Sequence, residues 1–476
     1  MFGRKFLTAT SLASLTFAVS GCSGVISTDV YKYYPVTLAG YAGDKEISVA
    51  YTGQIARHVL HDSLKNLAGQ GDGSSNDALK SMMMMYYGQK TKKREILAPK
   101  SKGAFVIKQT NVDQISKKKN LSGKTYKGVI SGMPGNMTGV ELIEFWIDKA
   151  AVANKGVDKE NGFNYQQLIS KFVMGAVSYN QAVDNYLDEK LGADTKPNNK
   201  AYKKGAAYTG KEHSWDEAFG YFGVPAHGLT LTPKDVYNIA KRKEAGVGAA
   251  DFNKDGKIDL KSEMAFAPAY YAAGFDASVY GKSNGTDYLH TITKAFLDGR
   301  KLITSANSKK LTSEQRAKLR EYADVIGKNW EKTLAEAAYK YAGSVYRDMT
   351  KLKTILDANG DTSKVLKNYL KHWGELKGFS LALQCGRKNL GEAATKLNRL
   401  IGYGPVMPNS SQVVDIDSKG NYVRDQTNWG EYMLHMAKAQ RLLEDKFAVK
   451  AKNKAIGGDL ADLAKQLGAG NSAEND

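Results

Sequence analysis

Two short segments place a histidine one helical turn from a carboxylate, an arrangement that suits a metal site in a helical protein. Residues 209–223, TGKEHSWDEAFGYFG, carry His213 with acidic residues three and four positions later, which share one face of a helix. Residues 365–384 carry a second histidine with a glutamate three positions later. Imidazole and carboxylate ligands suit iron or zinc better than copper(I). The candidate transition-metal ligands are His213, Asp216, Glu217, His372 and Glu375, and we assign no catalytic residue.

A simpler interpretation exists for both histidines. Thr209 and Glu212 fit a capping box, so residues 209–223 are also consistent with the capped start of a packed helix. His213 then lies in the first turn, where the helix dipole keeps the ring neutral. His372 falls on the apolar stripe of its own segment, which suits a core histidine paired with Glu375. Sequence spacing leaves open whether the two segments meet.

Residues 250–263, ADFNKDGKIDLKSE, follow the oxygen-donor pattern of an EF-hand loop around Gly256. The twelfth position departs from the pattern, because it holds Ser262 and the glutamate follows one residue later. The candidate calcium ligands are Asp251, Asn253, Asp255, the carbonyl of Lys257, Asp259 and Glu263. An Asx-rich turn that needs no ion is the alternative. The related segment 415–422 has Lys419 at a ligand position and predicts a hairpin turn instead.

The N-terminal residues have the features of a signal peptide. Arg4 and Lys5 precede an apolar run of roughly 14 residues, whereas a membrane span needs roughly 20. Small residues lead directly into Cys22, which resembles a bacterial lipobox and implies cleavage before Cys22 and its acylation. An ordinary signal peptide is the alternative. Ser23 favours the outer membrane of a diderm bacterium, so we expect a lipid-anchored protein of the cell envelope.

The composition limits the partners. The chain has two cysteines, so acylation of Cys22 leaves Cys385 unpaired, and we expect it to be a small core residue. The formal net charge of +19 falls by two, to +17, once Arg4 and Lys5 are removed. A basic surface suits anionic partners. The lysines are scattered without an aromatic-interleaved stripe, so we expect a solvated basic surface and no nucleic-acid partner.

Helices must position these groups. Apolar residues recur at steps of three or four over 54–68, 76–87, 138–154, 165–191 and 313–352. The chain has 9 prolines and no sustained alternating strand, so the predicted class is mainly α, a large helical bundle in one body or two lobes. The predicted organisation is a signal peptide (1–21), an acylated tether (22–45), a first helical lobe (46–245), a calcium-type loop region (246–285), a second helical lobe (286–450) and a flexible tail (451–476).

Four segments together resemble a family of bacterial lipoproteins known as domain of unknown function 4856; they are 47–67, 163–191, 211–223 and 372–384. This resemblance implies no activity. The pairs HSWD (213–216) and HWGE (372–375) are also similar to the His-x-x-Glu hallmark of imelysin-like proteins, helical envelope proteins tied to iron uptake. Lys211 and Leu370 stand where that hallmark has a glycine.

The leading functional hypothesis is a surface lipoprotein that binds a metal ion or a metal-bearing ligand such as haem, with structural calcium. The imelysin-like resemblance implies an outer-membrane uptake receptor as partner, and the basic surface suits an anionic metal chelate. The first alternative is a metal-dependent hydrolase, with Asp216 or Glu217 as general base beside zinc, although the chain has no HExxH or GxSxG motif. The second is a calcium-stabilised adhesin or cell-envelope interaction protein.

Overall fold

The structure is a computed structural model that describes residues 29–192, 195–386 and 390–470. Within these residues it contains 14 α-helices and one two-stranded sheet, so the prediction of a mainly α helical bundle is confirmed. The helices are α1 (Thr52–Leu67), α2 (Asp77–Tyr87), α3 (Gly139–Val152), α4 (Tyr165–Val173), α5 (Gly210–Phe222), α6 (Pro233–Ala240), α7 (Val247–Ala250), α8 (Ala267–Asp276), α9 (Tyr288–Ser305), α10 (Ser313–Asp357), α11 (Ser363–Ala382), α12 (Glu392–Ile401), α13 (Trp429–Phe447) and α14 (Leu460–Leu467). The strands are β1 (Ser411–Ile416) and β2 (Tyr422–Gln426).

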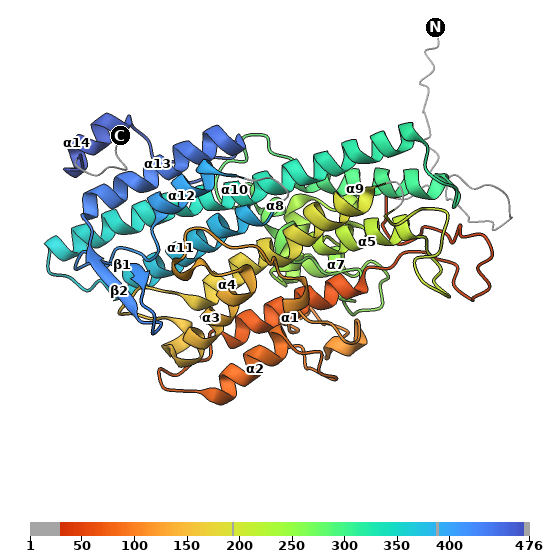
Figure 1. The fold of residues 1–476 in the computed structure, drawn as a ribbon, viewed down its shortest axis with the longest axis horizontal. Helices are drawn as coiled ribbons and strands as arrows, with labels where there is room; N and C mark the ends of the chain where they lie inside the picture. Colours follow the sequence, from red (N-terminus) through yellow and green to blue (C-terminus); the bar gives the residue numbers. More distant parts are fainter. Residues whose placement is uncertain (1–28, 193–194, 387–389, 471–476) are drawn as a thin grey trace, which may run out of the picture.

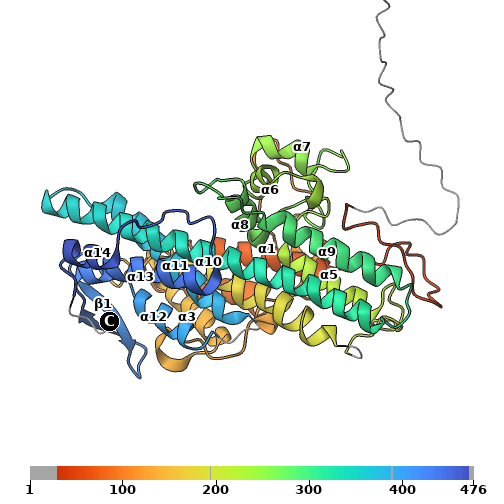
Figure 2. The same cartoon turned by 90° about the horizontal axis from the view of Figure 1, so that it is seen from above.

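The longest helix, α10, runs along most of the molecule (Figures 1 and 2). It begins at the predicted Thr312 cap, whose hydroxyl accepts the N–H of Gln315 at 3.2 Å. Its apolar stripe is buried, including Leu319, Ile326 and Trp330. α10 packs against α9, α11 and α13. The periodic apolar spacing therefore produces the central helix of the bundle.

The predicted helix over 165–191 divides into two parts. The first is α4, and a π-helix, Met174–Tyr186, continues it. Periodicity near 3.6 does not distinguish these two hydrogen-bonding patterns, because the hydrophobic residues remain buried in both. α4 packs directly against α11, so elements from the two predicted lobes share an interface, and one cluster of buried hydrophobic residues extends from Tyr31 to Ala469.

The segment at 415–422 is a hairpin turn, as its sequence predicts. β1 pairs antiparallel with β2, and the Asp417 carboxylate accepts the N–H groups of Lys419 and Asn421 at 2.8 Å each. Cys385 is a buried free thiol, which confirms its predicted core position.

The predicted signal peptide and Cys22 lie outside the described residues. In the part of the chain that is described, no helix has the length and apolar character that crossing a bilayer requires.

Candidate functional site

Asp216 belongs to a buried ion cluster rather than to the face that carries His213. One of its oxygens lies 2.8 Å from Nε of Arg300 on α9 and accepts the Tyr31 hydroxyl hydrogen at 2.9 Å. Its other oxygen accepts the N–H of Ala50 at 3.0 Å. Arg300 and Asp216 are completely buried, and burial raises the pKa of Asp216 to about 6 although Arg300 opposes this shift. These three partners already occupy the carboxylate.

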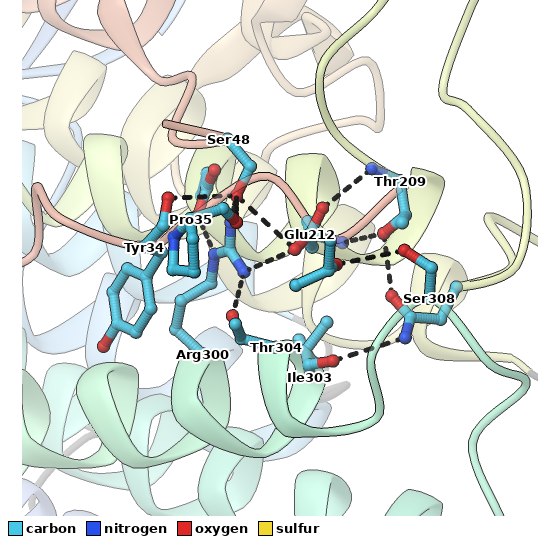
Figure 3. Close-up of polar contacts among 12 residues, drawn as sticks. Tyr34, Pro35, Ser48, Thr209, Glu212, Arg300, Ile303, Thr304 and Ser308 are labelled. Carbon is cyan, nitrogen blue, oxygen red and sulfur yellow. Dashed lines mark hydrogen bonds and ion pairs between the residues drawn. The ribbon is translucent and has the colours of Figure 1, made fainter. Parts of the chain in front are cut away.

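Glu212 completes the same cluster (Figure 3). Its carboxylate accepts the N–H of Thr209 at 2.9 Å, while the Thr209 hydroxyl accepts the N–H of Glu212 at 3.1 Å, so the predicted capping box is confirmed. The other Glu212 oxygen lies 2.9 Å from Nη1 of Arg300. Two carboxylates thus flank one guanidinium and join α5 to α9. This geometry indicates a structural role for Glu212 and Asp216.

His213 and Glu217 lie on a neighbouring face of α5. Nε2 of His213 is 3.7 Å from a Glu217 oxygen, and the ring stacks on Tyr208 with centroids 4.5 Å apart. Glu217 also accepts a hydrogen bond from Nε2 of Gln54 at 2.8 Å. Burial lowers the pKa of His213, so the neutral ring expected from the sequence is the favoured form.

His372 and Glu375 have separate partners on other helices. Nδ1 of His372 lies 2.6 Å from Asp348 on α10, and Glu375 lies 3.5 Å from Nζ of Lys171 on α4. α5 packs against α1, α9 and the π-helix, whereas α11 packs against α10 and α4. In the described ranges no group of three or more His, Cys, Asp or Glu side chains is arranged to hold a metal ion. A transition-metal site shared by the two segments stays a prediction that this geometry does not favour.

The calcium-type loop is closed by its own hydrogen bonds. The Asp251 carboxylate accepts the N–H groups of Asp255 and Gly256 at 3.1 and 2.9 Å. Glu263 accepts those of Asn253 and Asp259 at 3.3 and 2.7 Å. Outside the loop, Lys108 lies 3.1 Å from Asp255, and Gln109 donates to Asp259 at 2.7 Å. These hydrogen bonds are compatible with a calcium loop and with an Asx-rich turn that needs no ion, and calcium binding stays a prediction.

His58 and His61 of α1 have structural contacts. Nε2 of His58 lies 3.1 Å from the carbonyl oxygen of Gly220, and its ring stacks on Phe266. Nε2 of His61 lies 3.2 Å from the Ser170 hydroxyl. Burial lowers the pKa of both rings. They are satisfied core histidines.

Four basic side chains from distant parts of the sequence meet at one cavity of about 320 Å³, which we call the lysine pocket. Lys65 comes from α1, Lys171 from α4, and Lys241 and Arg242 from the end of α6. Asp62 is the acidic residue of its lining. Tyr270 and Tyr271 of α8 contribute aromatic rings, with Nζ of Lys241 4.7 Å from the Tyr270 ring centroid and Nζ of Lys171 5.6 Å from that of Tyr271.

Close helix packing brings Lys171 into this cavity. A Cβ on Gly378 of α11 would lie 2.6 Å from the Cβ of Lys171, so only glycine permits this approach of α4 to α11. Lys171 is 5% exposed, and its ammonium faces Glu375, which is also 5% exposed. A buried lysine is costly unless it is paired, so the Glu375 carboxylate stabilises the charge of Lys171 in the lining of the lysine pocket.

The lysine pocket contains more positive charge than its own acids neutralise. The charge of Lys171, followed by burial, lowers the pKa of Lys65 to about 8. Burial and then the charges of Lys65 and Lys171 lower the pKa of Lys241 to about 8. Burial raises the pKa of Asp62 to about 6, so this carboxyl is still largely ionised at neutral pH, but it offsets one charge among four cations in the lining. Arg242 adds a guanidinium charge to the lining, and its Nη1 donates to the carbonyl oxygen of Lys100 at 2.6 Å. These features suit an anion, because ammonium and guanidinium groups bind carboxylates and phosphates through charge-assisted hydrogen bonds.

Sequence reasoning missed the lysine pocket because its cations are far apart along the chain. Lys65 and Lys171 each lie in a segment whose apolar spacing predicts an amphipathic helix, and neither belongs to a run of basic residues. One signal was present, since Lys171 lies among the apolar residues of 163–191 and is therefore an inward lysine.

The comparisons with known proteins give one match. Residues 41–237 match the family model described as Domain of unknown function (DUF4856), and this span contains Lys65 and Lys171. No curated protein and no solved structure matches the chain. The imelysin-like and lipoprotein character of the chain stays a prediction. Over residues 41–237 this protein is therefore similar to the family described as Domain of unknown function (DUF4856).

Proposed function

We propose that this protein is a lipid-anchored binding protein of the cell envelope and that its lysine pocket binds a small ligand with more than one negative charge. The observation that carries the proposal is the convergence of Lys65, Lys171, Lys241 and Arg242 on one cavity with a single lining carboxylate, Asp62. The anchor rests on the lipobox-like residues before Cys22.

Unrelieved repulsion among the cations supports an anionic ligand. The largest cause of the lowered pKa of Lys65 is the charge of Lys171. An anion between them would remove that repulsion and return the pKa of Lys65 toward its ordinary value. Without a ligand, the repulsion makes the charged form of Lys65 unfavourable in the folded protein. Relief of this repulsion on binding would therefore add to the binding free energy of the anion.

The ligand class follows from the donors. Arg242 offers a guanidinium whose Nη1 already donates to the carbonyl oxygen of Lys100 at 2.6 Å, and its charge suits an oxygen of a carboxylate or phosphate. Lys65 and Lys241 add ammonium groups near it. Di- and tricarboxylates, phosphates and anionic carboxylate chelates of iron all present this chemistry. A chelate as ligand would connect the lysine pocket to the iron-uptake hypothesis without a protein-held metal.

The test is isothermal titration of the chain from residue 23 with inorganic phosphate, citrate and ferric citrate. We expect at least one of them to bind at a single site, and Lys65→Met and Lys171→Met to weaken that binding at least tenfold, because each removes a charged hydrogen bond worth about 1.5–3 kcal/mol. Lys353→Met is the matched control, since this exposed lysine pairs with Asp357 on the surface of α10. Absence of binding by all three probes, or equal binding by all variants, would refute the proposal.

A further inference from the structure

Three segments meet at the end of the molecule where α9 is connected to α10 (Figures 1 and 2). They are residues 29–48, 195–208 and 301–313. The hydroxyl oxygen of Thr37 lies 3.0 Å from that of Ser308. The side-chain amide of Asn198 donates to the carbonyl oxygens of Ile303 and Lys309 at 3.3 and 3.1 Å. These contacts hold the three segments together, and we call this part of the molecule the basic end.

The basic end carries a local excess of positive charge. Its three segments contain nine lysines and three acidic residues, which gives them a formal charge of +6. All three acidic residues belong to 29–48, so the loops 195–208 and 301–313 contain none. These two loops contact each other through Asn198. Their exposed lysines are Lys200, Lys203, Lys204, Lys309 and Lys310.

The opposite end of α10 has a different charge pattern. Residues 351–367, which include the α10–α11 turn, contain four lysines and two aspartates. Nζ of Lys353 lies 2.9 Å from Asp357 there. α10 has 45 residues, so its two ends are about 67 Å apart, several times the Debye length of about 8 Å at physiological ionic strength. A charged surface in contact with the basic end would therefore not attract the opposite end.

The proposed lipid anchor is close to the basic end. Asp29, the first described residue, follows Cys22 by seven positions, and seven residues span at most about 25 Å. A hydrogen bond to Asp298 is the main cause of the raised pKa of Lys294, and the charge of Asp29 contributes to it. The chain therefore enters the fold beside α9, whose end leads into 301–313. Because a reach of about 25 Å is less than half the length of α10, acylated Cys22 would hold the basic end near the membrane.

Exposed lysines are attracted to an anionic bilayer. Each lysine next to such a surface strengthens binding about fivefold. The attraction falls off within a Debye length, so it acts on side chains that lie next to the headgroups. Five exposed lysines in two loops that contact each other therefore favour one orientation of the protein on the bilayer.

We propose that the basic end docks on the surface of an anionic phospholipid bilayer. The lysine ammonium groups would contact the headgroup phosphates. The β1–β2 hairpin, at the other end of the molecule, would point away from the bilayer (Figure 1). This docking rests on the lipid anchor of the proposed function and adds an orientation to it. It does not involve the lysine pocket, whose lining contains none of the five lysines.

The test is cosedimentation of the unacylated chain from residue 23 with two kinds of vesicle. One is pure phosphatidylcholine, and the other contains equal parts of phosphatidylcholine and phosphatidylglycerol. We expect the chain to bind the vesicles that contain phosphatidylglycerol and not the others. Raising the salt concentration should release the bound chain, because salt screens the attraction.

Two variants with the same change in net charge locate the contact. The first removes four charges from the basic end and combines Lys203→Gln, Lys204→Gln, Lys309→Gln and Lys310→Gln. The control removes four charges from the opposite end and combines Lys351→Gln, Lys353→Gln, Lys364→Gln and Lys367→Gln. All eight lysines are exposed, so both variants should fold. We expect the first variant to bind anionic vesicles at least tenfold more weakly, and the control to change binding by less than about threefold.

Three outcomes would overturn docking by the basic end. They are equal binding to both kinds of vesicle, binding to neither kind, and a loss of binding that is the same in the two variants. The second outcome together with binding to heparin would assign the basic end to a soluble polyanion instead. None of them bears on acylation of Cys22 or on anion binding at the lysine pocket, so membrane docking and the proposed function can fail separately.

Discussion

Replacement of Lys65 by methionine should stabilise the protein in the absence of ligand. The pKa of this lysine falls from an ordinary 10.5 to about 8 in the fold. One pKa unit corresponds to about 1.4 kcal/mol, so the charged form costs the folded state up to roughly 3 kcal/mol at neutral pH. Methionine keeps the aliphatic stem and removes the charge. Asp62 loses a favourable neighbour in this variant, and we therefore expect a gain of about 1–3 kcal/mol.

The gain should depend on pH in a specific direction. Below pH 8 Lys65 is charged in both the folded and the unfolded chain, so its full cost is present. Between about 8 and 10.5 the folded chain binds fewer protons than the unfolded chain, and its stability rises with pH relative to the variant. The advantage of Lys65→Met should thus be largest near pH 7 and should disappear as the pH approaches 10.5.

Urea unfolding of the chain from residue 23, followed by circular dichroism at pH 7 and pH 10, measures this advantage. Lys353→Met is the control and should lie within about 0.5 kcal/mol of the unsubstituted chain at both pH values. A Lys65→Met variant that is less stable than the control at pH 7, or whose advantage does not change with pH, would refute the account of repulsion in the lysine pocket.

Three further predictions concern other parts of the chain. Arg300→Met should destabilise the fold by about 3–5 kcal/mol in urea unfolding, because Glu212 and Asp216 then share a buried site without a cation. Adding Glu212→Gln and Asp216→Asn to this variant should recover part of the lost stability. No recovery would contradict the ion-cluster account. If residues 251–263 bind calcium, a calcium concentration of a hundred times the Kd should stabilise the chain by about 2.7 kcal/mol relative to the chain in chelator. The same calcium concentration should not stabilise Asp251→Asn. Equal thermal unfolding temperatures with and without calcium would leave the Asx-rich turn as the explanation. Cys22→Ala should release the protein from the membrane fraction and abolish incorporation of labelled fatty acid, whereas retention of label would exclude Cys22 as the anchor.

Local features of the fold were predictable because neighbouring residues determine them. The Thr209–Glu212 and Thr312–Gln315 caps form as predicted, since each needs only residues three positions apart. The same holds for the apolar stripe of α10 and the hairpin turn near Asp417. In each case the interaction lies within one element.

Features that depend on the opposing element were not predictable. Spacing places Asp216 near the face of His213, but it does not reveal that Arg300 of α9 lies on the other side and attracts the carboxylate. His372 likewise pairs with Asp348 of α10 as well as lying one turn from Glu375. A pattern within one helix identifies candidate ligands and leaves their partners undetermined.

The lysine pocket is the strongest case of this limit. Its cations come from positions 65, 171, 241 and 242, and the charge distribution along the chain suggested a solvated surface. Lys171 becomes buried because Gly378 lets α4 approach α11, a contact between residues more than two hundred positions apart. Runs of charged residues in the sequence predict an exposed basic surface. They do not reveal that single basic residues from distant segments meet at one cavity.

Titration of citrate into the chain from residue 23 at pH 7.5 and pH 9.5 tests the lysine-pocket proposal most directly. Citrate is fully ionised at both pH values, so a change in affinity reports the protein. We expect binding at pH 7.5 that weakens at least tenfold at pH 9.5, as Lys65 and Lys241 lose their protons above about pH 8, because each charged hydrogen bond contributes about 1.5–3 kcal/mol. Citrate affinity that is the same at both pH values, or that Lys171→Met leaves unchanged, would contradict anion binding at the lysine pocket.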